Sequence, residues 1–399
     1  MLCLSIEFRR NSSFIVLWLG LGLIFYFPLL MDLIFQNKIY LSSTYKSVAF
    51  FSILFNCIYF FTRLFFGKKN NYSLIFDNGK INLYFLRVCS CFLFFSVMGV
   101  IGYYLISGIS ILNVTWSDKQ DLGPFMGLMV YFYYFGCISV FLSFLMKNRK
   151  YLFFSVILIL VFILLTQSRA IIIPAIAPFL IYMILYKKQW IRFLLFSIFA
   201  IFTFFVLQQI RYAGGVSDFF STDASIILKN TMDKILAEDN EFSLINSFYK
   251  IVESPQELTR YGEFSTFIRM IMVAYPDPLN TYYSIKPSDF TYDIYTHYYG
   301  YYQGTFHPTF YGLIYANSGF YFGLVSAVFF GLIVSFYDRV FNYLNLRRIY
   351  LVYFSVVVSC CHMSVLWARG SIYNGWSQGL FMSITSLVIF LILKQVLKK

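Results

Sequence analysis

Charged residues are scarce in this chain. Asp, Glu, Lys and Arg make up 12% of its 399 residues, whereas a soluble domain has about 25%. Hydrophobic residues reach 59%, and they include 50 Phe and 34 Tyr. A soluble core does not bury so many aromatic side chains, but helices that face lipid tolerate them. The sequence therefore predicts an all-α polytopic membrane protein.

The motifs that bind nucleotides and catalytic metals are also absent. The chain has no GxxxxGK[ST] or GxGxxG glycine pattern, no HExxH pattern and no Asp-x-Asp pair, and it has only three histidines. ATP hydrolysis, zinc catalysis and metal-bridged transfer from nucleotide sugars are therefore not expected. We expect a reaction that uses no cofactor and does not depend on a metal.

Cysteines give little sign of disulfides or metal binding. None of the seven lies in the long polar insert from Gln208 to His307, so the insert is not predicted to be stapled by disulfides. Cys360-Cys361-His362 and Cys89-Ser90-Cys91 lie inside apolar runs and lack a second pair of ligands. Packing in a span is the favoured interpretation of both.

Ten apolar runs are long enough to cross a bilayer, for which a helix needs about 20 residues. The N-terminal run follows two arginines, is longer than the apolar region of a signal peptide and lacks a small-residue cleavage site, so it is interpreted as a retained span. The predicted spans are Phe14–Phe35, Ser47–Phe66, Val88–Leu112, Pro124–Met146, Tyr151–Gln167, Ala170–Tyr186, Ile191–Leu207, Tyr311–Tyr337, Ile349–Trp367 and Trp376–Leu393. They define a seven-span region (1–207), a large loop of short helices (208–310) and a three-span region (311–399).

Lys and Arg are concentrated in alternate connections between these runs. The positive-inside rule then places both termini in the cytoplasm. The same rule places the insert, the Ser168-Arg169 hairpin and Arg369 on the outer face. Because this bias explains most of the net charge of +13, nucleic acid is not expected as a partner.

Short helices are predicted inside the insert. Apolar residues recur at helical spacing over Ser225–Ala237, Phe242–Val252 and Glu263–Val273. Such helices are expected to lie along the membrane surface. The segment Pro276–Tyr302 is rich in tyrosine and is predicted to be an ordered loop, whose tyrosines either stack on sugar rings or merely reflect an aromatic-rich composition.

Several arginines fall on the predicted outer face: Arg169, Arg211, Arg260, Arg269 and Arg369. The guanidinium group keeps its charge and matches the geometry of phosphate oxygens. Together they suggest a diphosphate at the membrane surface, on a polyprenyl-linked substrate. For Arg169 and Arg211 the alternative is a membrane-boundary anchor, and for Arg260 and Arg269 it is a solvated surface residue.

His307, where the chain re-enters the membrane, is the candidate base, because histidine exchanges protons near neutral pH. A hydrogen-bonded structural histidine beside Pro308 is the alternative. His362, inside a predicted span, is interpreted as a core histidine. The carboxylates that could replace His307 as base are Glu263, Asp277, Asp289 and Asp293.

Two short stretches resemble the O-antigen polymerase (Wzy) family. The first is Leu164-Leu165-Thr166-Gln167-Ser168-Arg169, and the second runs from His307-Pro308-Thr309 through Tyr315, Asn317 and Gly319. In residues the resemblance is confined to these stretches, whereas in architecture it covers the whole chain. The family is related to the O-antigen ligases.

The resemblance implies a bacterial inner-membrane enzyme with a periplasmic active site. Such an enzyme transfers the growing glycan from undecaprenyl diphosphate to the sugar terminus of a new lipid-linked repeat unit, and a chain-length regulator protein is a further expected partner. By analogy Arg169 and Arg211 hold the diphosphate, and His307 is the base or orients the acceptor. The residues expected to contact substrate are Arg260, Arg269, Tyr311, Tyr315, Asn317 and Arg369. The alternatives are an O-antigen ligase that acts on the lipid A core and a flippase for lipid-linked oligosaccharide.

Overall fold

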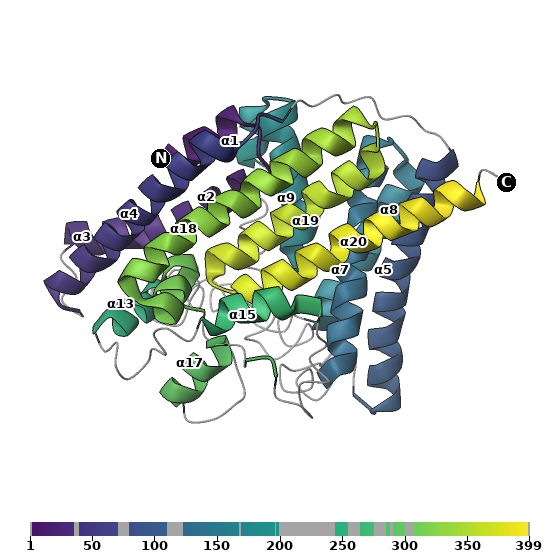
Figure 1. Cartoon of the computed structure of the whole chain (residues 1–399). Helices are drawn as coiled ribbons and strands as arrows, with labels where there is room; N and C mark the ends of the chain where they lie inside the picture. Colours follow the sequence, from purple (N-terminus) through teal and green to yellow (C-terminus); the bar gives the residue numbers. More distant parts are fainter. Residues whose placement is uncertain are drawn as a thin grey trace. The chain divides into compact units, whose positions relative to one another are not determined.

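The chain is an all-α polytopic membrane protein (Figure 1). The computed structural model describes residues 2–35, 40–70, 80–109, 123–166, 169–195, 197–198, 244–253, 264–274, 285–287, 290–299 and 307–397. Within these ranges every regular element is a helix. Eight helices there are long and apolar enough to cross a membrane: Ile15–Ile34, Ser42–Phe66, Lys80–Ile106, Phe125–Leu145, Arg149–Thr166, Thr309–Leu346, Tyr350–Arg369 and Ile372–Val396.

These eight helices confirm eight of the ten predicted spans, except that the predicted Tyr311–Tyr337 is not one continuous span, because the backbone is non-helical at Gly319. The sixth, predicted at Ala170–Tyr186, is helical but shorter, with an apolar helix over Pro174–Tyr186. The seventh, Ile191–Leu207, lies mostly outside the described residues. The third span starts earlier than the predicted Val88, because Phe85 and Leu86 are buried and extend the helix back to Lys80.

The helices before the insert are α1 (Leu2–Arg9), α2 (Ile15–Leu21), η1 (Gly22–Tyr26), α3 (Phe27–Phe35), α4 (Ser42–Phe66), α5 (Lys80–Ile106), α7 (Gly123–Leu145), α8 (Arg149–Thr166), η2 (Arg169–Ile172), α9 (Ile173–Ile181) and η3 (Tyr182–Tyr186). Those of the insert are α13 (Leu244–Glu253), α15 (Ser265–Ile271), η5 (Met272–Ala274) and α17 (Phe290–Tyr299). The last three are α18 (Thr309–Leu346), α19 (Tyr350–Arg369) and α20 (Ile372–Val396).

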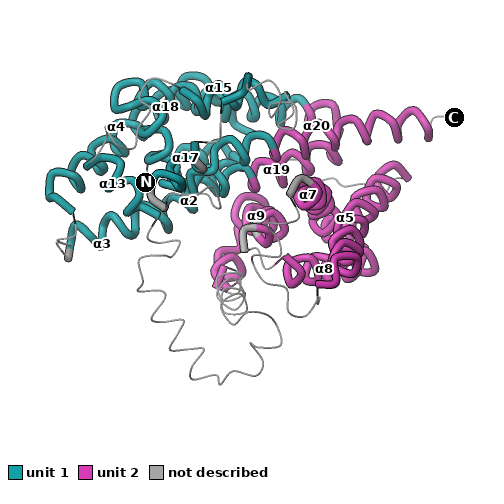
Figure 2. The backbone as a smooth tube through the Cα atoms, turned by 90° about the horizontal axis from the view of Figure 1, so that it is seen from below, with its two compact units in different colours: residues 1–71, 237–343, 363–377 teal, residues 72–236, 344–362, 378–399 magenta. Residues whose placement is uncertain are grey.

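The chain divides into two compact units, each built from three separate stretches of sequence (Figure 2). Unit 1 comprises Met1–Asn71, Ala237–Tyr343 and Met363–Ser377, and unit 2 comprises the remaining residues. In unit 2 the core is formed by α5, α7 and α8. Gly136 on α7 allows the close approach to α5, because a Cβ at that position would lie 2.6 Å from Cβ of Leu93.

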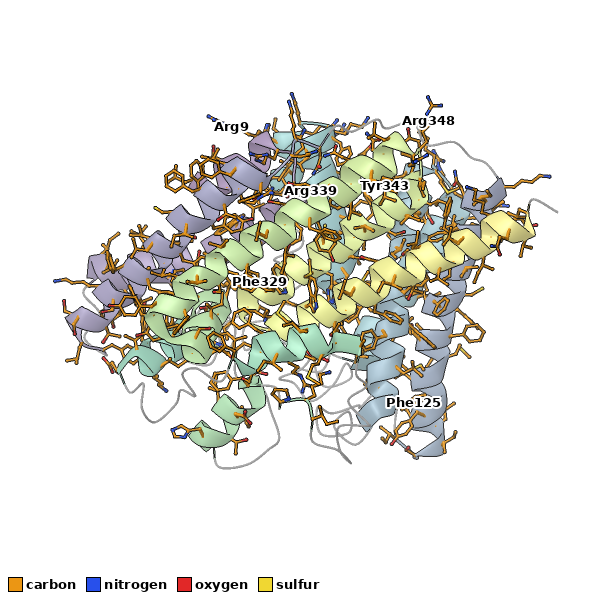
Figure 3. All side chains as sticks on the ribbon, in the orientation of Figure 1. Arg9, Phe125, Phe329, Arg339, Tyr343 and Arg348 are labelled. Atoms are coloured by element: carbon orange, nitrogen blue, oxygen red, sulfur yellow. The ribbon has the colours of Figure 1, made fainter. Side chains whose placement is uncertain are left out.

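In unit 1 a buried ion cluster ties the N-terminal helix α1 to α4 and α18. The Arg63 guanidinium lies 2.7 Å from a carboxylate oxygen of Glu7 and 2.7 Å from one of Asp338, and all three side chains are fully buried. The Tyr59 hydroxyl donates to Glu7, and the Asn70 amide donates to Asp338. We call this the Arg63 end of unit 1; Figure 3 labels Arg9, the last residue of α1, and Arg339, which follows Asp338 on α18.

The insert contacts the opposite end of unit 1. Oε1 of Glu253, the last residue of α13, accepts hydrogen bonds from the Leu41 backbone N–H at 2.7 Å and from the Thr44 hydroxyl at 3.0 Å. Glu253 thereby caps the N-terminus of α4, where free N–H groups favour a negative charge. The Tyr249 hydroxyl also donates to Asp32 at 2.9 Å. We call this the insert end of unit 1.

Two of the helices predicted in the insert are confirmed, as α13 and α15. The predicted helix Ser225–Ala237 lies outside the described residues. The prediction that Pro276–Tyr302 is a loop without helix is wrong, because α17 spans Phe290–Tyr299. Phe290 and Ile294 are buried one turn apart on one face of this helix. The many tyrosines around them obscured this helical spacing in the sequence.

Helix α18 is not straight, because the chain reverses at Gly319. This glycine has φ +67° and ψ −169° inside the helix. The ring centroids of Phe310 and Phe330 are 4.9 Å apart, whereas twenty residues of straight helix span about 30 Å. The segment Thr309–Ser318 therefore folds back against the rest of α18, which runs beside α4 (Figure 1).

The folded-back segment reaches deep into unit 1. Tyr311, near its start, donates a hydrogen bond to Asn56, which lies just past the middle of α4. Tyr315, one turn later, packs on Phe51, nearer the N-terminus of α4. The segment thus runs towards the insert end, and its first residues lie about halfway along α4.

Replacing Arg63 with alanine would leave the carboxylates of Glu7 and Asp338 buried without their cation. We expect Arg63→Ala to lower stability by about 3–5 kcal/mol, as for other broken buried ion pairs. The measurement is thermal unfolding of detergent-purified protein, with exposed Arg9→Ala as the control. Equal unfolding midpoints for the two variants would contradict the structural role of the cluster.

The reversal at Gly319 leads to a second prediction, about the stability of a Gly319→Ala variant. Alanine is strained at this backbone conformation, by roughly 1–3 kcal/mol, so Gly319→Ala should reduce the unfolding midpoint. Gly102→Ala is the matched control, since open space surrounds that helical glycine and alanine favours helix. A Gly319→Ala protein as stable as Gly102→Ala would show that α18 does not reverse there.

Candidate functional site

The turn between α19 and α20 packs directly onto the start of α18. Gly370 in this turn has φ +94°, and a Cβ there would lie 2.6 Å from the carbonyl oxygen of Thr309. Only glycine permits both the backbone conformation and the close approach. The contact places Arg369, the last residue of α19, next to the segment that contains His307.

His307 lies just before α18 and is partly exposed, but its ring nitrogen Nδ1 is buried. Burial, and to a smaller extent the positive charge of Arg369, lower the pKa of His307 to about 3. At neutral pH the ring is therefore uncharged, with one nitrogen able to accept a proton or a hydrogen bond.

Two cations converge on one aromatic ring at the start of α20. The Arg269 guanidinium carbon lies 4.3 Å from the centroid of the Tyr373 ring, and the Lys286 ammonium nitrogen lies 4.6 Å from it. Lys286 is buried and also donates a hydrogen bond to the Tyr373 hydroxyl. Arg269 in turn donates to the backbone carbonyl of Pro287 at 2.6 Å, which links α15 to the Ile285–Pro287 segment.

Helix α15 is held in place by polar contacts to α18 and α20. The Asn317 side-chain carbonyl accepts hydrogen bonds from the Ser265 hydroxyl and the Thr266 backbone N–H, both at 3.0 Å. Its amide donates to the Leu313 carbonyl at 2.9 Å, and the Trp376 indole donates to the Met270 carbonyl at 3.1 Å. In this structure Asn317 therefore positions the helix that carries Arg269.

Tyr311 and Tyr315 fix the folded-back segment against the rest of unit 1. Tyr311 is fully buried, and its hydroxyl lies 2.7 Å from that of Tyr26. The Tyr315 ring packs on Phe51 and Phe248, with centroids 5.2 and 5.6 Å away. These contacts are internal, so substrate binding by Tyr311, Tyr315 and Asn317 stays a prediction.

For three predicted site residues, Arg169, Arg211 and Arg260, the structure does not describe the side chain. Arg211 and Arg260 lie outside the described residues. Arg169 belongs to unit 2, where its backbone begins η2, and its side chain is also outside the description. Besides Tyr311, Tyr315 and Asn317, unit 1 thus contains His307 with Arg369 at the Gly370 turn, and Arg269 against Tyr373 at the start of α20.

Sequence reasoning missed Lys286 and Tyr373. Lys286 is a single lysine in a polar, tyrosine-rich stretch, and no local pattern distinguishes it from a solvated residue. Tyr373 was placed in the short connection before the predicted span Trp376–Leu393. Its position four residues after Arg369 was the only available signal.

The described part of the chain contains no group of three His, Cys, Asp or Glu side chains that could hold a metal ion. His362, predicted to be a core histidine, is buried in unit 2 and its Nε2 lies 2.6 Å from the Gln378 side-chain oxygen. Cys89, Cys360 and Cys361 are buried as well.

Comparison of the chain with protein-family models, with curated proteins and with solved structures gave no match. The resemblance to the O-antigen polymerases therefore stays a prediction.

The lowered pKa of His307 predicts a pH dependence of stability. The folded protein binds the proton less tightly than the unfolded chain, whose histidine titrates near pH 6.5. The contribution of His307 is therefore complete above about pH 6.5. It is lost as the pH falls towards 3, by at most about 1.4 kcal/mol per pH unit.

Thermal unfolding of the purified protein between pH 7.5 and pH 4 measures this loss. His307→Gln should flatten the fall in unfolding midpoint relative to the unsubstituted protein. Arg369→Gln removes one cause of the lowered pKa and should flatten it less. Parallel curves for all three proteins would show that His307 is not buried as described.

Proposed function

We propose that the chain polymerises lipid-linked oligosaccharide repeat units, transferring the growing glycan from undecaprenyl diphosphate to the sugar terminus of a new lipid-linked unit. The observation that carries the proposal is the cluster at the α19–α20 turn. It combines a neutral histidine beside Arg369 with two cations on Tyr373, in a protein whose helices are apolar enough to span a membrane. We propose the inner membrane as its location, with this cluster facing the periplasm and both termini in the cytoplasm.

The proposed chemistry is a displacement at the anomeric carbon of the growing chain. The bond from this carbon to the diphosphate oxygen breaks, and its electron pair leaves with the polyprenyl diphosphate. A hydroxyl of the incoming unit forms the new bond, and its proton passes to His307. The leaving group already carries negative charge, so fixed cations stabilise it and the step needs no metal.

Within this scheme the cations have separate positions. Arg369 lies beside the proposed base, whereas Arg269 and Lys286 lie on the ring of Tyr373, in the first turn of α20. A diphosphate bound at Arg369 would offset the positive charge next to His307. This would remove the smaller of the two causes that lower the pKa of His307, because burial is the larger. We propose Arg169 and Arg211 as further diphosphate ligands on the family resemblance alone.

Two alternative functions are compatible with the same observations. A ligase acting on the lipid A core would use the same donor and the same groups. A flippase is favoured by one feature, the reversal of α18 at Gly319, because broken helices near the membrane midplane are typical of transporters. The cluster of a base with cations favours group transfer over transport.

The test uses purified protein in detergent with a synthetic undecaprenyl-diphosphate oligosaccharide, no nucleotide and excess EDTA. A ladder of products spaced by one repeat unit is expected. His307→Ala should lower its rate by about 10²–10⁴-fold, the usual contribution of a general base. Lys286→Ala, Arg269→Ala, Arg169→Ala and Arg211→Ala should weaken substrate use. Lys250→Ala, which removes an exposed cation on α13, is the matched control.

The alternatives give different results in the same preparation. A single capped product that forms only with added lipid A core would indicate a ligase. Movement of labelled lipid-linked sugar across vesicles, without any new glycosidic bond, would indicate a flippase. Full activity of His307→Ala would remove this residue from the mechanism.

A further inference from the structure

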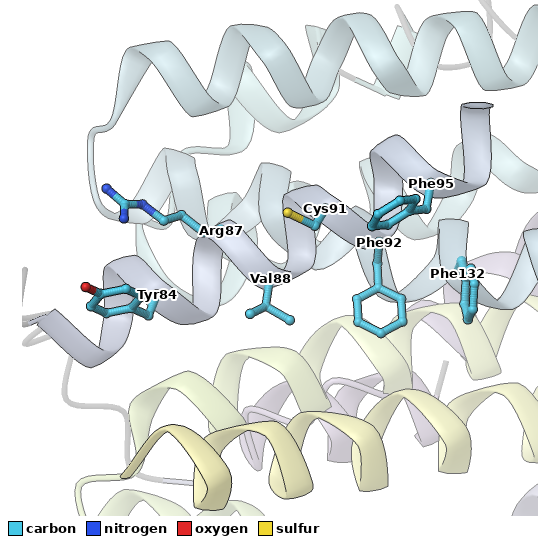
Figure 4. A pocket seen from close by; sticks show the side chains of 7 residues that line it. All are labelled: Tyr84, Arg87, Val88, Cys91, Phe92, Phe95 and Phe132. Carbon is cyan, nitrogen blue, oxygen red and sulfur yellow. The ribbon is translucent and has the colours of Figure 1, made fainter. Parts of the chain in front are cut away.

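Unit 2 has a groove on α5 and α7 that the proposed function does not use (Figure 4). Its volume is about 370 Å³, and its wall includes Tyr84, Arg87, Val88, Phe92, Phe95 and Phe132. This volume lies within the range of small-molecule sites, which is about 300–1,000 Å³. Both helices are apolar and long enough to cross a membrane, so the groove is placed to meet lipid.

The lining of the groove is apolar throughout, and polar groups lie beside only one of its ends. Figure 4 shows the Tyr84 and Arg87 side chains at one end and three phenylalanine rings at the other. The exposed Arg87 guanidinium lies 5.4 Å from the centroid of the Tyr84 ring. A cation next to a tyrosine is the arrangement found where a spanning helix meets lipid headgroups.

The length of the groove matches one leaflet of a bilayer. From Tyr84 to Phe95 the helix advances eleven residues, or about 16 Å at 1.5 Å per residue. Half of the hydrocarbon core is about 15 Å thick. A lipid whose headgroup lies at Arg87 would therefore lay one acyl chain along the phenylalanines without crossing the midplane.

We infer that this groove binds an anionic phospholipid, with its phosphate at Arg87 and one acyl chain against Phe92, Phe95 and Phe132. The apolar wall alone would accept any lipid tail, but the cation at its end selects a net negative headgroup. The charge bias of the connections assigns the Arg87 end to the cytoplasmic leaflet.

Native mass spectrometry of the purified full-length protein tests this inference. The protein is incubated with equal amounts of phosphatidylglycerol and phosphatidylcholine that carry the same acyl chains. We expect one retained phosphatidylglycerol, favoured about fivefold, the effect of a single surface arginine. Arg87→Gln should abolish the preference, and Val88→Trp should fill the groove and reduce retention of both lipids. Lys80→Gln, a cation on the same helix outside the groove, should behave like the unsubstituted protein.

The native Cys91 thiol gives an independent readout, because it is exposed on the groove wall. Phosphatidylglycerol should slow its reaction with a maleimide, and phosphatidylcholine should do so less. Equal retention and equal protection by the two phospholipids would overturn the inference. So would displacement of phosphatidylglycerol by undecaprenyl phosphate at equal concentration, which would identify the occupant as the polyprenyl carrier. Arg87→Gln keeps the test decisive if Val88→Trp does not fold.

Discussion

The contact between Gly370 and the Thr309 backbone is the constraint on which the proposed site depends. A side chain at residue 370 would collide with the Thr309 carbonyl oxygen, at 2.6 Å from its Cβ. With glycine there, the α19–α20 turn closes onto the start of α18, and Arg369 lies beside His307. The reversal at Gly319 supplies the other half of the geometry, because it brings Thr309 back into the middle of unit 1.

The charged side chains of unit 1 have different partners at the Arg63 end and at the α19–α20 turn. At the Arg63 end one guanidinium pairs with two carboxylates, Glu7 and Asp338, in a fully buried cluster that stabilises the packing of α1, α4 and α18. At the α19–α20 turn Arg269 and Lys286 instead lie against the Tyr373 ring, and burial, with the charge of Arg369, lowers the pKa of His307. Positive charges brought together in this way favour an anionic substrate, which is why the proposed chemistry is assigned to the α19–α20 turn.

The sequence alone was enough to predict most of the spans and some residues of the proposed site. Long apolar runs and the spacing of Ile245 and Phe248 depend only on local pattern, so eight spans and helix α13 could be predicted. The reversal of the chain at Gly319 could not be predicted from the sequence. Apolar residues flank this glycine on both sides, and a continuous span fits the same pattern. Lys286 meets Tyr373 across 87 positions, and only tertiary folding creates such a contact. Arg269 was predicted as a ligand, but its position depends on Asn317, which was expected to bind substrate.

The most direct test of this account is a cross-linking measurement on the double variant Phe310→Cys/Phe330→Cys. Their parent rings lie 4.9 Å apart by centroid, whereas a straight helix would separate the two positions by about 30 Å. The account predicts that a short thiol cross-linker joins the two cysteines within one chain in membranes, as identified by peptide mass spectrometry. Single labelling of both cysteines without a cross-link would show α18 to be continuous, and the site built around His307 and Arg369 would not exist.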